Sequence, residues 1–287
     1  MSPRKGSGPV SASTPPGTQP TPEPNPGPRN ARTDDSGIRR YTWQGIEYPS
    51  VTSLRRMVGI PFTLHNWILS QHIEAALDLM RTPDTIEGLP WDEVGKSIRK
   101  LGTAKRDRAA DLGNRVHAST AAGMVPDKAP PDEAPFLRQY QHWLKDQRPS
   151  VLLSERRVFN LRLGYGGSFD LLLNDAWGRL VLTDIKTGEG TYLDHVLQLL
   201  GYAFADFVAA DSDEDRIDDE ATRLLEQVVA IAILHLRPEG WRYIELVVDT
   251  RGRRAFESMA RLAHWMDVES LDGYTSRVIA GSAPKEA

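Results

Sequence analysis

The chain contains no cysteine among its 287 residues. This absence excludes disulfide bonds, thiolate zinc sites, cysteine nucleophiles and cysteine-ligated iron–sulfur clusters. It also suits a reducing compartment, and we expect a cytoplasmic location. No run of about 18 apolar residues occurs, so we expect no membrane-spanning helix. Arg4 and Lys5 are followed by no apolar stretch, so we expect no secretory signal.

The chain also lacks the G-x-x-x-x-G-K-[ST] pattern of P-loop proteins, which excludes a built-in motor of that kind. Its composition is ordinary for a globular protein, with 40% hydrophobic and 26% charged residues. The net charge of −4 does not favour nucleic-acid binding. However, seven acids and one Arg within residues 211–220 contribute −6, so the remainder carries +2. Because local patches decide phosphate binding, a nucleic-acid partner stays open.

Four regions follow from the composition along the chain. Residues 1–38 hold nine of the 20 prolines and almost no large apolar side chain, which predicts a disordered tail. We expect a mainly helical part over 39–150, an α/β core over 151–275 and a flexible C-terminus over 276–287. The helical part begins with a hairpin, Tyr41–Tyr48, around Gln44-Gly45. Its expected helices are Val51–Val58 with Ser50 as N-cap, Thr63–Met80, Trp91–Gly123 with a break near Gly102, and Phe136–Lys145.

The hydrophobic period changes after residue 150. Short runs rich in branched and aliphatic residues predict strands, and two amphipathic runs predict helices. The acidic residues 211–220 predict a solvated loop. This order favours an α/β fold with a mixed central sheet flanked by helices and a helical N-terminal portion. The expected strands are Val151–Leu161, Gly167–Asn174, Leu180–Thr187, Val228–Leu236 and Trp241–Val248, and the expected helices are Thr191–Ala210 and Arg253–Val268.

The third expected strand carries charged side chains. Strand alternation places Asp184 and Lys186 on one face, after Leu180 and Leu182. A hairpin about the turn at 175–178 would bring Asp170 to the same end of the sheet. Two converging carboxylates repel each other unless a cation lies between them, and such ligands suit Mg²⁺ or Mn²⁺. A metal and a lysine together can support phosphodiester hydrolysis, because the metal activates water and the ammonium group stabilises developing negative charge.

Four motifs, in their residues and in their order along the chain, resemble those of the PD-(D/E)XK nuclease superfamily, in particular its RecB-like and phage exonuclease members. Asp170 precedes Asp184-Ile185-Lys186 by fourteen residues. Gly113-Asn114-Arg115-Val116-His117 is similar to the family's G-x-x-x-H, and Gln198-Leu199-Leu200-Gly201-Tyr202 is similar to its Q-x-x-x-Y. Pro49-Ser50-Val51-Thr52 is similar to the opening of phage-type members. The resemblance covers roughly residues 41 to 250 and implies a restriction-endonuclease-like core.

The resemblance also implies roles for individual residues. The metal ligands would be His117, Asp170, Asp184 and the main-chain carbonyl of Ile185. Lys186 would position or activate water. Glu155 matches an acidic residue of the first core strand and would be a second-metal ligand or would orient Lys186. Gln198 and Tyr202 would lie near the active site or the DNA backbone. Arg115 is a further candidate DNA contact because it lies on the basic helix of His117.

Other charged and basic residues receive a more general interpretation. Lys105, Arg106, Arg108 and Arg115 make the His117 helix basic, which is typical of a solvated face or of a phosphate track. The other six histidines, His195 and His235 among them, are interpreted as structural.

The resemblance favours a metal-dependent DNA exonuclease of recombination, replication or repair. DNA is the expected partner, a recombination or single-strand-binding protein is a further one, and oligomerisation stays open. The iron–sulfur subgroup of the family is excluded by the lack of cysteine. Three alternatives remain: an endonuclease with the same site, a non-catalytic DNA-binding or structural member, and a phosphate-handling hydrolase of unrelated fold. The last would separate Asp170 and Asp184 by more than about 8 Å, too far to share a metal.

Overall fold

A computed structural model describes residues 31–35, 37–59, 62–211 and 215–268. Most of the expected disordered tail and the whole expected flexible C-terminus, residues 276–287, lie outside these ranges. The expected end of the tail at residue 38 is wrong, because β1 (Ala31–Thr33) pairs antiparallel with β2 (Arg39–Trp43). Strand pairing uses backbone groups. A boundary drawn from the scarcity of apolar side chains therefore misses a short edge strand.

The predicted N-terminal hairpin and its following helix are confirmed. β2 joins β3 (Ile46–Pro49) through Gln44 and Gly45, which both have positive φ, at 49° and 76°, as a two-residue hairpin turn favours. The Ser50 side chain caps α1 (Val51–Val58) by accepting a 3.0 Å hydrogen bond from the Ser53 amide. Helix α1 packs into the main hydrophobic core through Val51 and Leu54, so it shares that core with the sheet.

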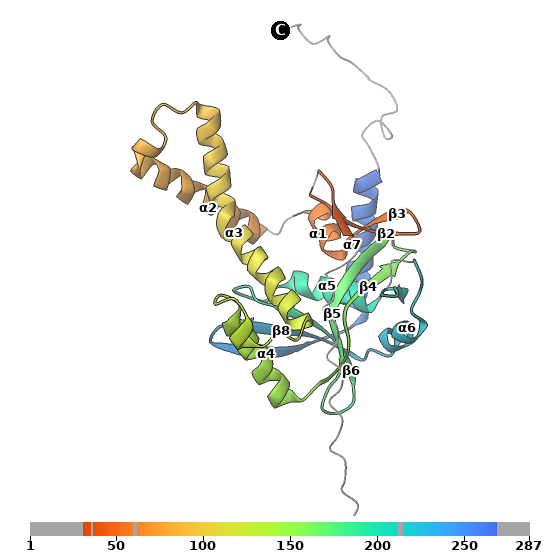
Figure 1. The fold of residues 1–287 in the computed structure, drawn as a ribbon. Coiled ribbons are helices and arrows are strands. Elements are labelled where there is room, and N and C mark those ends of the chain that lie inside the picture. Colours follow the sequence, from red (N-terminus) through yellow and green to blue (C-terminus); the bar gives the residue numbers. More distant parts are fainter. Residues whose placement is uncertain (1–30, 36, 60–61, 212–214, 269–287) are drawn as a thin grey trace, which may run out of the picture.

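Helix α2 (Phe62–Arg81) and the N-terminal part of α3 (Trp91–Ala121) form an arm that projects from the body of the molecule (Figure 1). The expected break of α3 near Gly102 is wrong, because the helix is continuous. A Cβ atom at Gly102 would lie 2.6 Å from the ring of His72 and 3.0 Å from its Cα. The glycine therefore serves the close approach of the two helices and does not bend α3.

A pair of glycine substitutions within α3 tests this explanation. Gly102→Ala is expected to lower the free energy of unfolding by about 1–3 kcal/mol, because the added methyl overpacks the α2–α3 contact. Gly95→Ala is the matched control, since its Cβ would meet only the ends of the Arg99 side chain, at 3.6 Å and beyond. Removing a mid-helix glycine there should stabilise the protein by about 0.5–1 kcal/mol. Equal effects of the two substitutions in urea unfolding would contradict the assignment.

The central sheet is mixed and has six strands, in the order β7-β4-β5-β6-β8-β9. Strands β6 and β8 are parallel, and every other neighbouring pair is antiparallel. The five predicted strands of this sheet are confirmed with small shifts at their ends. The bounds are β4 (Ser150–Asn160), β5 (Tyr165–Asn174), β6 (Leu180–Lys186), β7 (Phe207–Val208), β8 (Ala230–Arg237) and β9 (Gly240–Leu246).

Two expectations in the middle of the chain are wrong. The predicted helix Thr191–Ala210 ends early: α5 spans Leu193–Ala203, and Phe207 begins β7 instead. Phe207 packs against Trp43 and Phe159, with ring centroids 4.7 and 5.7 Å away, so aromatic burial outweighs helical periodicity there.

The second error concerns the acidic loop. Part of the segment expected to be a solvated loop instead begins a helix, α6 (Asp219–Glu226). Asp218 caps this helix by accepting a 3.0 Å hydrogen bond from the Ala221 amide, and it also pairs with Arg156 at 2.7 Å. Residues 212–214 lie outside the described residues. Several acids of this segment therefore stabilise α6, as its N-cap and in its first turn.

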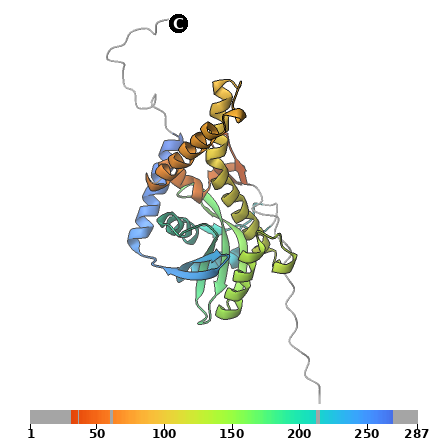
Figure 2. The same cartoon turned by 90° about the vertical axis from the view of Figure 1, so that its left-hand side faces the viewer.

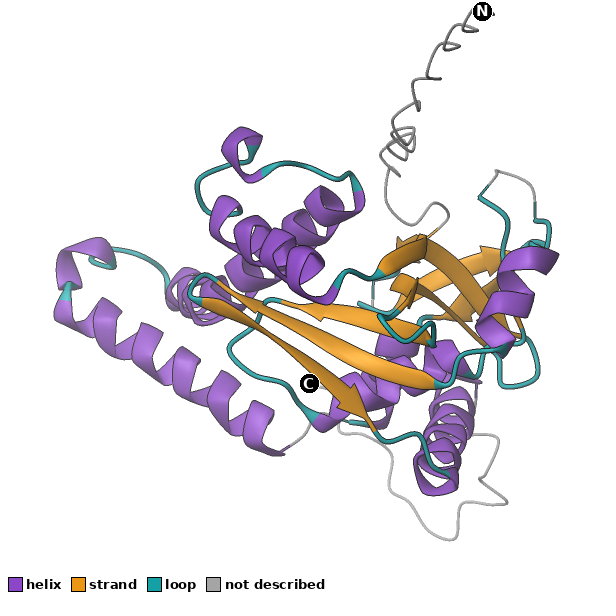
Figure 3. Cartoon of the chain, turned by 90° about the horizontal axis from the view of Figure 1, so that it is seen from below, coloured by secondary structure: helices purple, strands orange, loops and turns teal. Residues whose placement is uncertain are grey.

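Helices cover both faces of the sheet, as Figures 2 and 3 show. One face packs on α1, α5, α6 and α7 (Thr250–Val268), through residues such as Leu54, Leu200 and Phe256. The other face packs on the lower part of α3 and on α4 (Ala134–Gln147), through Val116 and Trp143. The predicted α/β class with a flanked mixed sheet is therefore confirmed. Within the described ranges, no helix has both the length and the apolar character needed to cross a membrane.

Candidate metal centre

Asp170 is the hub of a buried polar group where α3 meets the sheet. The antiparallel register pairs Leu171 of β5 with Thr183 of β6, which places Asp170 level with Asp184 on the neighbouring strand. The Asp170 Oδ2 atom accepts a 2.6 Å hydrogen bond from the Ile185 amide, and Oδ1 lies 3.3 Å from His117 Nδ1. This adjacency of the two aspartates argues against the hydrolase of unrelated fold, which requires them to be far apart.

Glu155 of β4 lies opposite Asp170 at an irregularity of the sheet. It falls between the pairs Ser154–Leu171 and Arg156–Phe169, and its φ is +52°. Such a left-handed conformation costs a non-glycine residue about 1–3 kcal/mol and is concentrated at functional sites. The alternation of β5 is also interrupted here. Phe169 packs in the hydrophobic cluster on one face of the sheet, whereas Leu171, two residues later, packs in the cluster on the opposite face.

Three of these side chains can hold one metal ion together. Ligand atoms of His117, Glu155 and Asp170 all lie within 4.8 Å of one another. One imidazole nitrogen and two carboxylates form a donor set that suits Mn²⁺ and, through the oxygens, Mg²⁺. The residues present therefore fit the divalent cation that the sequence predicts.

The pKa values in this group show the charge that a cation would balance. Burial raises the pKa of Glu155 to about 8, and the nearby Asp170 adds to the rise. Burial would lower the pKa of His117, but the charge and hydrogen bond of Asp170 outweigh it and raise that pKa to about 9. Burial likewise opposes ionisation of Asp170, yet its His117 partner holds the Asp170 pKa below the usual value. The metal-free centre therefore retains protons at neutral pH where a divalent cation can replace them.

A second set of contacts links Asp184, Lys186 and helix α5. The Lys186 ammonium lies 2.5 Å from Asp184 Oδ2, while Gln198 Nε2 donates to Asp184 Oδ1 at 3.1 Å and to the Tyr202 hydroxyl at 2.9 Å. Burial raises the pKa of Asp184 to about 6 in spite of the neighbouring ammonium group. Burial opposes the charge of Lys186, but Asp184 and Asp170 together raise the Lys186 pKa above its usual value, so the side chain is cationic.

The metal ligands predicted from the resemblance divide between these two sets. His117 and Asp170 belong to the cluster that can hold a cation, and Glu155, whose role was the least defined, completes it. Asp184 instead directs its carboxylate to Lys186 and Gln198. Ile185 contributes its amide to Asp170 and buries its side chain. The resemblance implies Glu155 as a second-metal ligand or an orienter of Lys186, but no sequence pattern predicts the left-handed backbone that it has in the cluster.

Two glycines permit the close approaches that shape the site. A Cβ atom at Gly113, one helical turn before His117, would lie 3.2 Å from Thr187 Oγ1. A Cβ atom at Gly167 would lie 2.6 Å from the ring of Tyr202. The glycine of the G-x-x-x-H pattern thus lets α3 approach the end of β6 and bring its histidine to the sheet.

Arg115, predicted to contact DNA, ties α3 to the segment before α4. Its guanidinium forms ion pairs with Asp111 at 3.0 Å, with Asp132 at 2.6 Å and with the buried Glu133. A phosphate contact by Arg115 would have to compete with these three carboxylates.

A pocket of about 400 Å³ opens beside Lys186. Its basic residues include Arg55 and Arg56 of α1, which sequence analysis did not single out, and Arg55 pairs with Asp194 at 3.3 Å. His195 also lines it, and burial together with the charge of Lys186 lowers its pKa to about 4, so its ring is neutral at pH 7. His195 precedes Gln198 by three residues, so the helical spacing that groups Gln198 with Tyr202 could have found it.

Comparison with known proteins adds little to this geometry. No family model matches the chain, and no curated protein matches it. Among solved structures, it is similar to the crystal structure of SSO0001, with 14% sequence identity over 57% of this chain and 69% of that one. The TM-score is 0.27, which is too low to support a conclusion about fold or function.

Proposed function

We propose that this chain is a metal-dependent nuclease that hydrolyses DNA phosphodiester bonds. The observation that carries the proposal is the convergence of ligand atoms of His117 on α3, Glu155 on β4 and Asp170 on β5 within 4.8 Å of one another, beside the Asp184–Lys186 pair of β6. A cation site, a cationic side chain and an adjoining pocket are what metal-assisted phosphodiester hydrolysis requires.

In this proposal each residue has a defined task. A divalent cation held by His117, Glu155 and Asp170 would polarise the phosphate and lower the pKa of bound water. The Ile185 amide fixes the Asp170 carboxylate, which orients the ligand before substrate binds. Lys186 places a positive charge at the edge of the pocket, where it can position water or stabilise the negative charge that develops in the transition state. Gln198 holds Asp184 and thereby the orientation of Lys186.

The choice of DNA as substrate, of exonuclease action, and of a role in recombination, replication or repair rests on the resemblance to RecB-like and phage-type members of the PD-(D/E)XK superfamily. An endonuclease with the same site is the alternative within this chemistry. A non-catalytic DNA-binding member is less well supported, because Asp170, Asp184 and Lys186 are all present and in contact with the groups that orient them.

A degradation assay tests the proposal. The purified full chain would be mixed with end-labelled linear duplex, covalently closed circular duplex and single-stranded DNA, each with Mg²⁺, Mn²⁺ or EDTA. Metal-dependent loss of linear but not circular DNA is the expected result, and cutting of circles would favour the endonuclease. Binding without cleavage of any substrate would favour the non-catalytic alternative.

The protons held in the metal-free centre predict how stability depends on pH. The folded-state pKa values of Glu155, about 8, and His117, about 9, both exceed the ordinary values of these side chains, 4.5 and 6.5. Between pH 6.5 and 8.5 the folded state therefore holds more protons than the unfolded state, and its stability falls as pH rises. With EDTA we expect the melting temperature to decrease across this range.

Saturating Mg²⁺ should reduce that decrease, because the cation replaces the protons and binds only the folded site. Glu155→Gln supplies the control, since it removes one of the two titrating groups and should flatten the curve in EDTA. If the plots of melting temperature against pH with and without Mg²⁺ were parallel over the whole range, these residues would not bind the ion.

A further inference from the structure

The continuous helix α3 connects the metal centre to the projecting arm. Because an α-helix has 3.6 residues per turn, the 18 residues between Arg99 and His117 make five whole turns. Arg106, about three turns before His117, lies near the same face, and so does Ala110. Arg99 and Arg106 therefore lie on the same face of α3 as His117, the candidate metal ligand near the C-terminal end of that helix. Along the arm they extend this face away from the metal centre.

This face of α3 opens onto the pocket beside the metal centre. Ala110 lines that pocket together with Lys186 and Arg56. Gly113 approaches Thr187 at the end of β6. A polymer that entered the pocket and continued along α3 would next meet Arg106 and then Arg99.

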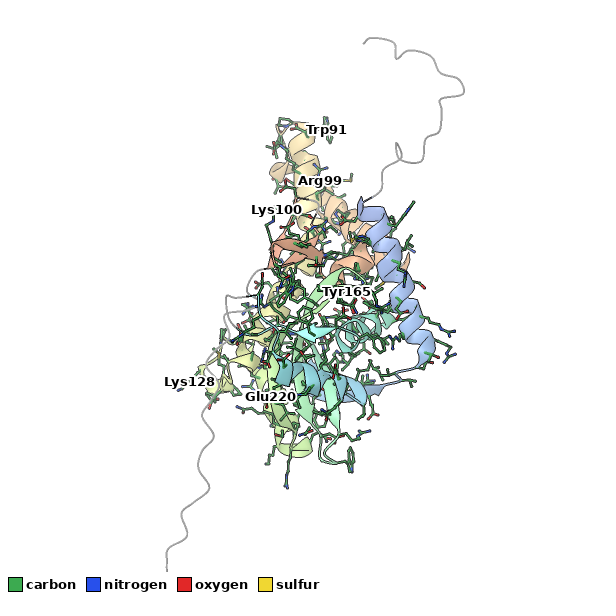
Figure 4. All side chains as sticks on the ribbon, turned by 90° about the vertical axis from the view of Figure 1, so that its right-hand side faces the viewer. Trp91, Arg99, Lys100, Lys128, Tyr165 and Glu220 are labelled. Atoms are coloured by element: carbon green, nitrogen blue, oxygen red, sulfur yellow. The ribbon has the colours of Figure 1, made fainter. Side chains whose placement is uncertain are left out.

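Both arginines are exposed and available to a ligand. Among the residues that the structure describes, Arg106 forms an ion pair with the adjacent Asp107, at 3.0 Å, and both side chains are at least half exposed, so the pair contributes little. Arg99 has no ion pair with any residue of the described ranges. Figure 4 shows Arg99 and the next residue, Lys100, on different sides of the helix. The face turns acidic seven residues before Arg99, at Asp92, which marks the end of the basic stretch.

We propose that the arm binds the sugar–phosphate backbone of the substrate beyond the scissile bond, with Arg106 and Arg99 as successive phosphate contacts. This proposal rests on the proposed nuclease function and specifies where its polymer substrate lies. At 1.5 Å per residue, Arg106 and Arg99 lie about 16 and 27 Å from His117 along the helix. At 3.4 Å per nucleotide of duplex, these distances correspond to about five and eight base pairs from the cut. Guanidinium groups suit this task because they bind phosphate through two parallel hydrogen bonds.

DNA binding by the full chain in EDTA, where no cleavage is expected, tests the proposal. Fluorescence anisotropy would compare wild type with the double variant Arg99→Ala/Arg106→Ala on a labelled 20-base-pair duplex. Loss of two phosphate contacts should weaken binding about tenfold or more near 0.1 M NaCl and reduce the slope of log K against log salt by about two. The matched control is Lys105→Ala/Arg108→Ala, which removes two charges from other faces of the same helix and should leave the slope near that of wild type.

Substrate length provides a second readout. The Arg99→Ala substitution should weaken binding of a 12-base-pair duplex. It should not weaken binding of a 6-base-pair duplex, which is too short to reach from the metal centre to Arg99. Equal salt-dependence slopes for the Arg99/Arg106 and control variants would overturn the proposal that these arginines contact successive phosphates. A binding defect that does not depend on duplex length would overturn it as well.

Hydrolysis of bis(p-nitrophenyl) phosphate by the wild-type, metal-loaded protein separates this result from failure of the proposed function. That small diester needs only the metal centre. If wild type cleaves neither it nor DNA, the nuclease assignment fails. If wild type cleaves the diester while the arginine variants bind DNA as wild type does, only the proposed phosphate contacts of the arm fail.

Discussion

Replacing Lys186 with alanine is expected to lower the rate of DNA hydrolysis by about 10³-fold, the range seen when one group that stabilises transition-state charge is removed. The ammonium is the cationic side chain that contacts Asp184 beside the metal centre. Single-turnover rates with saturating Mg²⁺, measured on linear duplex, would give the effect on the chemical step. A variant that retains full activity would show that the site is wrongly assigned.

The same substitution should also destabilise the metal-free protein. Asp184 is 1% exposed, and removal of its partner leaves a buried carboxylate unpaired, which costs about 3 kcal/mol or raises the pKa of Asp184 until it takes up a proton. The double variant Lys186→Met/Asp184→Asn removes both charges and should recover most of that stability while remaining inactive. Recovery of stability without activity separates the chemical role of Lys186 from its structural one. If the double variant were as unstable as Lys186→Ala, the ion pair would not be the cause.

Asp170→Asn should produce the other large effect, the loss of both hydrolysis and metal binding. Asp170 offers a ligand oxygen to the candidate cation site, accepts a hydrogen bond from the Ile185 amide and holds the His117 pKa high. We expect Mn²⁺ affinity, measured by calorimetry, to fall at least about 100-fold when this charged ligand becomes a neutral amide. The His117 pKa, followed by NMR, should fall as well, because burial then acts without the opposing carboxylate.

A surface substitution controls for nonspecific effects of an aspartate-to-asparagine change. Asp146 lies exposed on α4, away from the cluster, and Asp146→Asn should leave Mn²⁺ affinity and the His117 pKa unchanged. Retention of wild-type Mn²⁺ affinity by Asp170→Asn would exclude Asp170 as a ligand, whatever the effect on cleavage.

Local patterns of the sequence predicted most of the sheet and the placement of several site residues. Alternation in β6 put Asp184 and Lys186 on one face, and the structure pairs them. The four-residue spacing of Gln198 and Tyr202 put them on one face of α5, and the structure joins them by a hydrogen bond. These features depend on a fixed periodicity, so a single sequence is enough to reveal them.

The features that sequence analysis missed depend on contacts between distant segments. Gly102 looked like a helix break, but its role is defined by His72 on another helix. Phe207 looked helical, but Trp43 and Phe159 hold it in a strand. Glu155 was expected at the site from the resemblance, but its left-handed backbone within a strand, a state that its side-chain type disfavours, was not. Each of these requires knowledge of which segments meet, and no periodicity encodes that.

The order in which the chain is synthesised has a consequence for when the centre can act. His117 leaves the ribosome before Glu155 and Asp170, and Lys186 leaves later still. Synthesis proceeds at about 5–20 residues per second, so the ligands become available one after another over several seconds. The cation-binding cluster can therefore close only around a chain that has already paired β4 with β5, and a ribosome-bound fragment that ends before β6 lacks Lys186 altogether. Under the proposed function, a fragment that ends before β6 would therefore be inactive, and all the site residues would be present before β8 and β9 complete the sheet.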